Sequence, residues 1–439
     1  MDITYTPDQQ RLRGELREYF SALMTPERRE AFTSTTGEYG HGNAYREIVA
    51  EMGRDGWLTL GWPEEFGGRN RPMIEQLIFT DEAAIAGVPV PFLTINSVAP
   101  TIMAFGSEEQ KNYFLPRISR GELHFGIGYS EPDSGTDLAS LRTRAVREAG
   151  TGEYEGQDVY RINGQKMWTS LVAYADWIWL AARTDPDAKR HKGISMILVP
   201  TTAEGFSWTP VHTMAGPDTS ATYYQDVVVP ASNLVGPEHG GWPLMTNQLN
   251  HERVALTSAG PLQASLRQVL AWARDTRSAD VGLPGDGTVI EHEWVRTHLA
   301  RVHAMAEYLA LRNWEIVSAD TAAPTRIAAS ATKVYGTETA CEAYRLLMEV
   351  LGSSGYQRAH SPTAALHGRI ERLHRSALIL TFGGGTNEVQ RDIIAAAGLG
   401  LPPAPRVAPA PASTASAGAR FGSTASGAPA SSTTARKDG

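Results

Sequence analysis

The hydrophobic pattern of this chain changes twice along its 439 residues, near Leu123 and again near Trp242. Before the first point and after the second, apolar residues recur at the three- and four-residue spacing of amphipathic helices. Between the two points, short runs of aromatic and β-branched residues are bounded by Gly, Pro, Asn and Asp, which is typical of strands. The sequence therefore predicts an α+β multidomain protein with domains in the order helical, β and helical.

Residues 1–122 are predicted to form an N-terminal all-α domain. Thr6, followed by Pro7 and Gln9, is a recognisable helix start, because threonine caps the helix and Gln9 can bond back to the cap. Further helices are expected at 45–52, 74–86 and 107–118. The stretch 61–68 is too rich in Gly and Pro for a helix or a central strand and is predicted to be a loop.

Residues 123–235 are predicted to form a compact antiparallel β domain, either a barrel or a sandwich. Strands are expected at 160–162, 177–182, 194–199 and 223–229. Asn163-Gly164 suits a tight hairpin turn, because such turns require positive φ angles.

Residues 236–400 are predicted to form a C-terminal four-helix bundle. Long helices are expected at 244–273, 291–318, 327–351 and 366–380, with a shorter one at 388–397. The remaining stretch, 401–439, consists almost wholly of Pro, Ala, Ser, Thr and Gly, and is expected to be a disordered tail.

Composition excludes several classes of protein. A formal net charge of -8 argues against a general nucleic-acid binder, which needs a basic face. The single cysteine, Cys341, cannot form an internal disulfide, which fits a reducing compartment or a protein indifferent to redox conditions. The N-terminal residues lack the pattern of a signal peptide, and no stretch is apolar enough to cross a bilayer. A cytoplasmic protein with no membrane association is therefore expected.

Common cofactor and catalytic motifs are missing from the sequence. There is no GxxxxGK[ST] or GxSxG, and Gly126 and Gly128 lack the third glycine of a dinucleotide fingerprint. Glu371 and His374 form one ExxH pair, but the bundle has no second pair with which to build a di-metal site. No metal is expected, and this pair is predicted to lie on a solvated or salt-bridged helix face.

The stretch Asn250-His251-Glu252-Arg253 is predicted to open a helix that runs from Val254 towards position 273. A carboxylate at this point is most often an ordinary, favourable feature of a helix start. The alternative is that Glu252 is a proton acceptor at the entrance of an apolar helix.

Three short segments are specific when taken together: YSEPDSGTDL at 129–138, NGQKMWTS at 163–170 and FGGGTNEVQR at 382–391. With the domain order and the loop GWPEEFGG at 61–68, they closely resemble the acyl-CoA dehydrogenase family of flavoproteins, over everything except the tail. The resemblance implies an enzyme that contains FAD and oxidises an acyl-CoA thioester to a trans-2-enoyl-CoA. A carboxylate removes the α-proton while the flavin N5 accepts a hydride from the β-carbon.

The resemblance also implies roles for individual residues. FAD contacts are implied for Tyr129, Ser130, Thr136, Trp168, Ser170, Gly385 and Thr386. Substrate contacts are implied for Thr136, Asn250, Arg253 and Gly384.

The position of the catalytic base departs from the commoner family pattern. Many members carry a glutamate before the last helix, where this chain has Gly384. A second group of members carries the base at the position of Glu252, and this sequence follows that group. The backbone N–H of Gly384 could still donate to the thioester oxygen. Arg253 matches a family arginine whose charge would help to keep the carboxylate ionised.

The FAD contacts that a neighbouring subunit donates in this family are altered. An Arg-x-x-Phe-Gly motif is absent from 278–288, and the Gln-x-x-Gly-Gly-x-Gly motif has Glu349 for Gln and Ser353 for Gly. An anionic Glu349 would be unfavourable beside a diphosphate. We therefore expect the base-carrying α subunit of an α2β2 enzyme, whose β partner donates the missing contacts.

Segments 80–101, 210–224 and 382–394 resemble the catalytic subunit of actinobacterial heteromeric dehydrogenases that shorten steroid side chains by β-oxidation. This resemblance implies a bulky branched or steroid side-chain acyl-CoA as substrate, and an electron acceptor such as electron-transfer flavoprotein. The basic cluster 189–192 could contact the CoA phosphates or form a solvated loop. The alternative function is a non-catalytic flavin-binding or scaffolding subunit, in which Glu252 is only a helix carboxylate.

Overall fold

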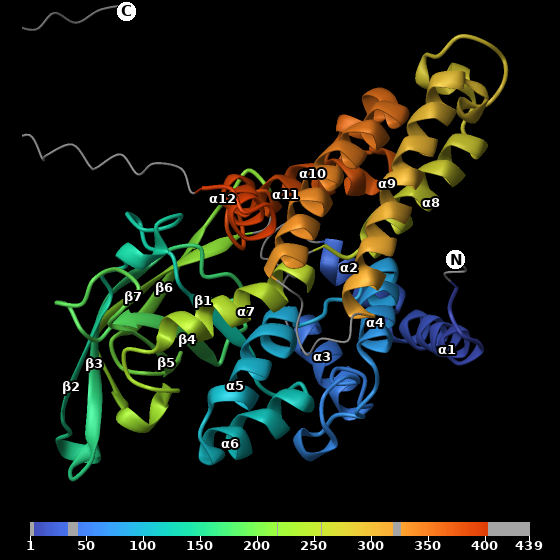
Figure 1. The fold of residues 1–439 in the computed structure, drawn as a ribbon. Coiled ribbons are helices and arrows are strands. Elements are labelled where there is room, and N and C mark those ends of the chain that lie inside the picture. Colours follow the sequence, from blue (N-terminus) through green and yellow to red (C-terminus); the bar gives the residue numbers. More distant parts are fainter. Residues whose placement is uncertain (1–3, 34–42, 217, 256, 319–325, 403–439) are drawn as a thin grey trace, which may run out of the picture. The chain divides into compact units, whose positions relative to one another are not determined.

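The computed structural model describes residues 4–33, 43–216, 218–255, 257–318 and 326–402 (Figure 1). At 250–255 it describes the helical backbone but not the side chains. The predicted order of a helical domain, a β domain and a second helical domain is confirmed along the chain. Within the described ranges, no helix is both long and apolar enough to cross a membrane.

The N-terminal part is helical, with α1 (Pro7–Leu23), α2 (Pro26–Thr33), α3 (Ala44–Arg54), α4 (Met73–Ala86), α5 (Ala99–Phe105) and α6 (Glu108–Ser119). The predicted capping box is present at α1, where Thr6 N donates to Gln9 Oε1 at 2.9 Å and Gln9 N donates to Thr6 Oγ1 at 3.3 Å. The predicted loop at 61–68 contains only a short 3-10 turn, Glu64–Phe66.

The middle part is an eight-stranded sheet. Its strands are β1 (Phe125–Gly128), β2 (Arg144–Ala149), β3 (Asp158–Lys166), β4 (Trp177–Arg183), β5 (Ile194–Pro200), β6 (Phe206–Val211), β7 (Thr219–Pro230) and β8 (Leu234–Val235). The order is β6-β7-β3-β2-β4-β5-β8, and β1 pairs with β4. Most pairs are antiparallel as predicted, but β4 pairs in parallel with β1 and β2. A parallel pair needs a long crossover, which the chain between β1 and β4 provides.

The prediction of a hairpin turn at Asn163-Gly164 is wrong. Both residues lie inside β3, where the register with β7 shifts between Ile162 and Gly164. Asn163 bridges this bulge, because its Nδ2 donates to Asp226 Oδ1 and its Oδ1 accepts from Asp226 N, both at 2.9 Å. The positive φ of Gly164, 152°, serves a β-bulge and not a turn.

The C-terminal part is helical again, with α7 (Gly241–Ala255), α8 (Gly260–Asp275), α9 (Glu293–Val317), α10 (Arg326–Leu351), α11 (Arg369–Leu380) and α12 (Asn387–Ile393). The predicted single helix at 244–273 is in fact two helices. Pro261 lies in the first turn of α8, where its missing N–H is tolerated but would break a continuous helix. Glu252 therefore lies in the last turn of α7, and the prediction that it opens a helix is wrong.

One hydrophobic core runs through the predicted domain boundaries at 122 and 235. It joins Phe79 on α4 and Phe125 on β1 to Trp179 on β4 and Leu244 on α7. A second core fills the space between α8, α9, α10 and α11. The sheet and α7 are thus packed against the N-terminal helices, and the described residues up to Pro402 form one compact unit.

Candidate active site

Tyr129, at the end of β1, connects the sheet to α7. Its ring is buried, and its hydroxyl accepts from Trp179 Nε1 at 3.0 Å and donates to Gln248 Oε1 on α7. Residue 252 lies one turn after Gln248, and residues four apart lie on the same side of a helix. Gln248 therefore ties α7 to the loop that begins at Tyr129, and position 252 follows one turn later along this helix.

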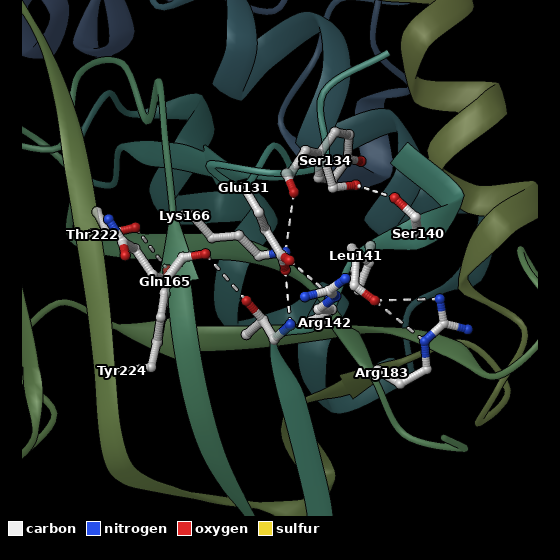
Figure 2. A network of polar contacts seen from close by, with 12 residues as sticks. Glu131, Ser134, Ser140, Leu141, Arg142, Gln165, Lys166, Arg183, Thr222 and Tyr224 are labelled. Atoms are coloured by element: carbon white, nitrogen blue, oxygen red, sulfur yellow. Dashed lines mark hydrogen bonds and ion pairs between the residues drawn. The ribbon is translucent and has the colours of Figure 1, made fainter. Parts of the chain in front are cut away.

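A buried ion pair holds this loop against the end of β3 (Figure 2). Glu131 Oε1 accepts from Lys166 Nζ and from Thr143 N, both at 2.8 Å. Lys166 Nζ also donates to Tyr129 O at 3.0 Å. Met167, the next residue after Lys166, donates its N–H to the carbonyl of residue 130 at 2.8 Å. The segments 129–131 and 166–167 are therefore locked side by side.

The charges of this pair are set by burial and by each other. Burial raises the pKa of Glu131, but the Lys166 charge and the hydrogen bonds from Lys166 and Thr143 outweigh it, so the pKa is lowered. Burial lowers the pKa of Lys166 to about 8, against the opposing effect of Glu131. Both groups are thus charged at neutral pH, and their main effect is to hold the loop in place.

Beyond this pair, the two segments present exposed side chains. Trp168 is 56% exposed and has a φ of 63°, which is rare for a non-glycine residue and typical of functional sites. Ser170 Oγ lies 3.3 Å from Thr219 Oγ1 at the start of β7, and Thr136 is exposed. An exposed indole followed two residues later by the Ser170 hydroxyl suits a planar ring with apolar faces and polar edges. These residues fit the flavin that the sequence implies.

The glycine loop between α11 and α12 contains three more of the predicted site residues, Gly384, Gly385 and Thr386. Gly384 and Gly385 have φ angles of 68° and 91°, which favour glycine. Thr386 caps α12, because its side chain accepts from Val389 N at 3.3 Å. The loop is anchored by Lys333 on α10, whose Nζ donates to Gly385 O at 2.8 Å.

Lys333 was not predicted from the sequence, although a signal exists. Ala329, Lys333, Thr337 and Ala340 recur at helical spacing along the buried side of α10. A lysine within such a stripe needs buried partners.

Asn250, Glu252 and Arg253 lie in the last two turns of α7, and their side chains are outside the described part of the chain. The backbone is still enough to test whether Glu252 is a favourable carboxylate at a helix start, because it places residue 252 in the last turn of α7. A carboxylate is favourable in the first turn of a helix but unfavourable in the last turn. Helix stability therefore gives no reason for a glutamate at this position.

The structure links the glycine loop to the β domain through α11. Arg375 Nη1 donates to Met214 O at 2.7 Å in the connection between β6 and β7. Arg375 also pairs with Glu371, Nη2 to Oε2 at 2.9 Å, which confirms the predicted salt-bridged face for that carboxylate. The connection leads to Thr219, the neighbour of Ser170.

Glu349 is not a free anion. Its carboxylate accepts from His298 Nε2 at 2.8 Å and pairs with Arg345. Much of its charge is therefore compensated within the chain. The basic cluster 189–192 lies in an exposed turn before β5, where Arg183 Nη1 donates to Lys192 O at 2.8 Å.

Comparison with known proteins identifies the same three parts. Residues 6–122 match the acyl-CoA dehydrogenase N-terminal domain, 126–227 the middle domain and 239–399 the C-terminal domain. The acyl-CoA dehydrogenases FadE26 and FadE29 of Mycobacterium tuberculosis are 64% and 46% identical to this chain, each covering 92% of it and 100% of the relative.

Two solved structures are similar over the same extent, 92% of this chain and 100% of each matched chain. They are the ChsE4-ChsE5 complex from Mycobacterium tuberculosis, with a TM-score of 0.83 at 64% identity, and the Tcur3481-Tcur3483 steroid ACAD, with a TM-score of 0.82 at 46% identity.

Proposed function

Because this chain belongs to the acyl-CoA dehydrogenase family, we propose that Glu252 is the base that removes the α-proton of an acyl-CoA thioester. Members of this family are FAD-dependent oxidoreductases that act on CH–CH bonds, and this chain is one of them. The observation that carries the proposal is the hydrogen bond from Tyr129 to Gln248. It supports a position for Glu252 beside the loop assigned to the flavin.

The proposed FAD site combines residues of the β domain with residues of the glycine loop between α11 and α12. Tyr129 and Ser130 would contact the ring through their backbone, Thr136 and Ser170 through their hydroxyls, and Trp168 would pack against a ring face. Gly385 and Thr386 would lie near the diphosphate or adenine end. When bound, FAD accepts the hydride from the β-carbon of the substrate.

The location of Glu252 at the end of α7 suits a base. The negative end of the helix dipole disfavours an ionised carboxylate and so increases its affinity for a proton. Arg253 would act in the opposite direction and keep the base ionised before the reaction. Negative charge then develops on the thioester oxygen, where the backbone N–H of Gly384 would donate a hydrogen bond.

For the substrate, we propose a bulky branched or steroid side-chain acyl-CoA, held by Thr136, Asn250, Arg253 and Gly384. The support is the similarity to a protein described as a steroid ACAD. The reaction would take place in the cytoplasm, with electrons passing to an acceptor such as electron-transfer flavoprotein.

The test is Glu252→Gln, produced together with the partner subunit and assayed over a panel of acyl-CoAs that includes steroid thioesters. We expect FAD to stay bound and turnover to fall by roughly a thousandfold, because the amide cannot take the proton. The control is Glu109→Gln, an exposed carboxylate on α6 that should leave turnover unchanged. Wild-type turnover in Glu252→Gln with bound FAD would reject the proposed base and favour the scaffolding subunit.

A further inference from the structure

One turn of α10, from Lys333 to Thr337, touches both segments that the proposed reaction needs. On one side it holds the glycine loop between α11 and α12. On the other side Gly336 makes room for the connection after α7, since a Cβ at Gly336 would lie 2.8 Å from Thr257 Cβ. Asn313 on α9 secures the same connection by donating from Nδ2 to Thr257 O at 2.8 Å.

The Lys333 ammonium makes the contacts on the side of the glycine loop. Its Nζ donates to Gly385 O at 2.8 Å, Thr381 O at 3.1 Å and Asn387 Oδ1 at 2.7 Å. An ammonium has three N–H donors, and these three acceptors belong to the loop or to the first residue of α12. The side chain is fully buried, where an unsatisfied charge would be very costly. The position of the loop is therefore tied to α10.

Asn387, the first residue of α12, is held by α10 a second time. Its Nδ2 donates to Thr337 Oγ1 and Glu338 Oε1, both at 3.1 Å. The glycines that precede it have no side chains with which to pack against the rest of the protein. Backbone bonds within the loop, such as Asn387 N to Thr381 O at 2.9 Å, and polar contacts to α10 together hold Gly384 and Gly385 in their left-handed conformation.

We propose that Lys333 is a positioning residue, which keeps the Gly384 N–H in line with the thioester oxygen. This inference rests on the proposed function, because only there does Gly384 bind the thioester. A donor displaced by about 1 Å loses on the order of 100-fold in rate. Lys333 does not touch the reacting atoms; it acts through the loop.

The test is Lys333→Met in the complete enzyme, with FAD and the partner subunit. Methionine keeps the length and the apolar stem of the side chain but removes the three donors. We expect kcat to fall by about 10- to 100-fold while KM changes by less than about twofold, because the lost interaction strengthens in the transition state. In the substrate-free enzyme, peptides that cover 381–391 should exchange amide hydrogens faster.

Two further variants separate positioning from general stability. Leu347→Ala removes a fully buried side chain from the core around the same helix, so it should lower Tm and leave kcat and loop exchange unchanged. Thr337→Val removes a hydroxyl partner of Asn387. It should lower kcat and speed amide exchange of the loop, each by less than Lys333→Met does. It keeps the test decisive if Lys333→Met does not assemble.

A Lys333→Met enzyme with wild-type kcat, or with loop exchange no faster than wild type, would overturn the proposal. If Lys333→Met does not assemble, unchanged exchange in Thr337→Val would do the same. The proposed base fails separately, through wild-type turnover of Glu252→Gln. Amide exchange of the loop is measured without substrate, so it tests the role of Lys333 whether or not Glu252 is the base.

Discussion

The Asp81 carboxylate on α4 accepts a hydrogen bond from the Ser258 hydroxyl in the connection between α7 and α8. Burial raises the pKa of Asp81 to about 6, although the Ser258 bond lowers it, and nearby Glu82 raises it further. Gly260 N and Arg13 act in the opposite direction. The fold therefore disfavours the ionised form of Asp81, a group on α4 that contacts the connection after the helix of the proposed base.

This shift predicts a dependence of stability on pH. An unfolded aspartate titrates near 3.9, so the stability contributed by Asp81 is fully present below about pH 4 and is lost as pH rises through about 6. Asp81→Asn stays neutral and can still accept from Ser258. We expect the variant to exceed wild type by about 1–2 kcal/mol at pH 8 and by much less at pH 4.5. Urea unfolding at both pH values tests this, and an equal difference at the two would contradict it.

Single residues were predictable where their partners are close in sequence. The Thr6–Gln9 capping box spans three residues and could be predicted from those residues alone. The contacts of Asp81 and Lys333 could not, because Ser258 lies 177 positions from Asp81 and Asn387 lies 54 from Lys333. No local pattern indicates which distant group will satisfy a buried charge.

At the scale of elements, the buried pair of Glu131 and Lys166 joins the loop after β1 to the end of β3. Lys166→Met would leave the Glu131 carboxylate without its buried counter-ion. We expect a loss of about 3–5 kcal/mol in unfolding free energy, measured by chemical denaturation.

The double variant Glu131→Gln with Lys166→Met is the matched control. It removes both charges and should be more stable than Lys166→Met alone, since no unpaired charge remains. A single variant as stable as wild type would show that the pair does not hold the loop.

The elements themselves were partly predictable. Helices such as α4 and α10 follow a clear apolar period and were predicted within a few residues of their observed bounds. The break between α7 and α8 was not predicted, because apolar residues continue through it, although Gly260-Pro261 marks it. β1, with two glycines among its four residues, and the charged β2 lack the usual strand signals; their place in the sheet comes from pairing with β4 and β3.

At the scale of the whole molecule, the question is whether this chain completes its own flavin site. Glu349 and Ser353 stand at positions where the family resemblance implies residues donated by a neighbouring subunit, and Glu349 is paired with His298 and Arg345 in this chain. Of the two similar structures described above, one is named as a complex of ChsE4 and ChsE5, and the name of the other joins Tcur3481 and Tcur3483. A heteromeric α2β2 enzyme is therefore the assembly that we propose.

This assembly predicts how FAD is retained. Expressed alone, the chain should lose FAD on gel filtration, because the contacts donated by the partner are missing. Co-expressed with the partner, it should keep FAD and have the mass of an α2β2 complex by native mass spectrometry. A stable homo-oligomer of this chain with stoichiometric, tightly held FAD would contradict the prediction.

Because Lys333 is fully buried, opening of the glycine loop can also be followed by chemical labelling of this lysine. An amine-acylating reagent needs contact with the lysine nitrogen, so it should modify exposed residues such as Lys189 at once and spare Lys333 while the loop is closed. Labelling of Lys333 would then proceed only as fast as the loop opens. The rate at which Lys333 is labelled would thus report the rate of loop opening, with no probe added to the protein.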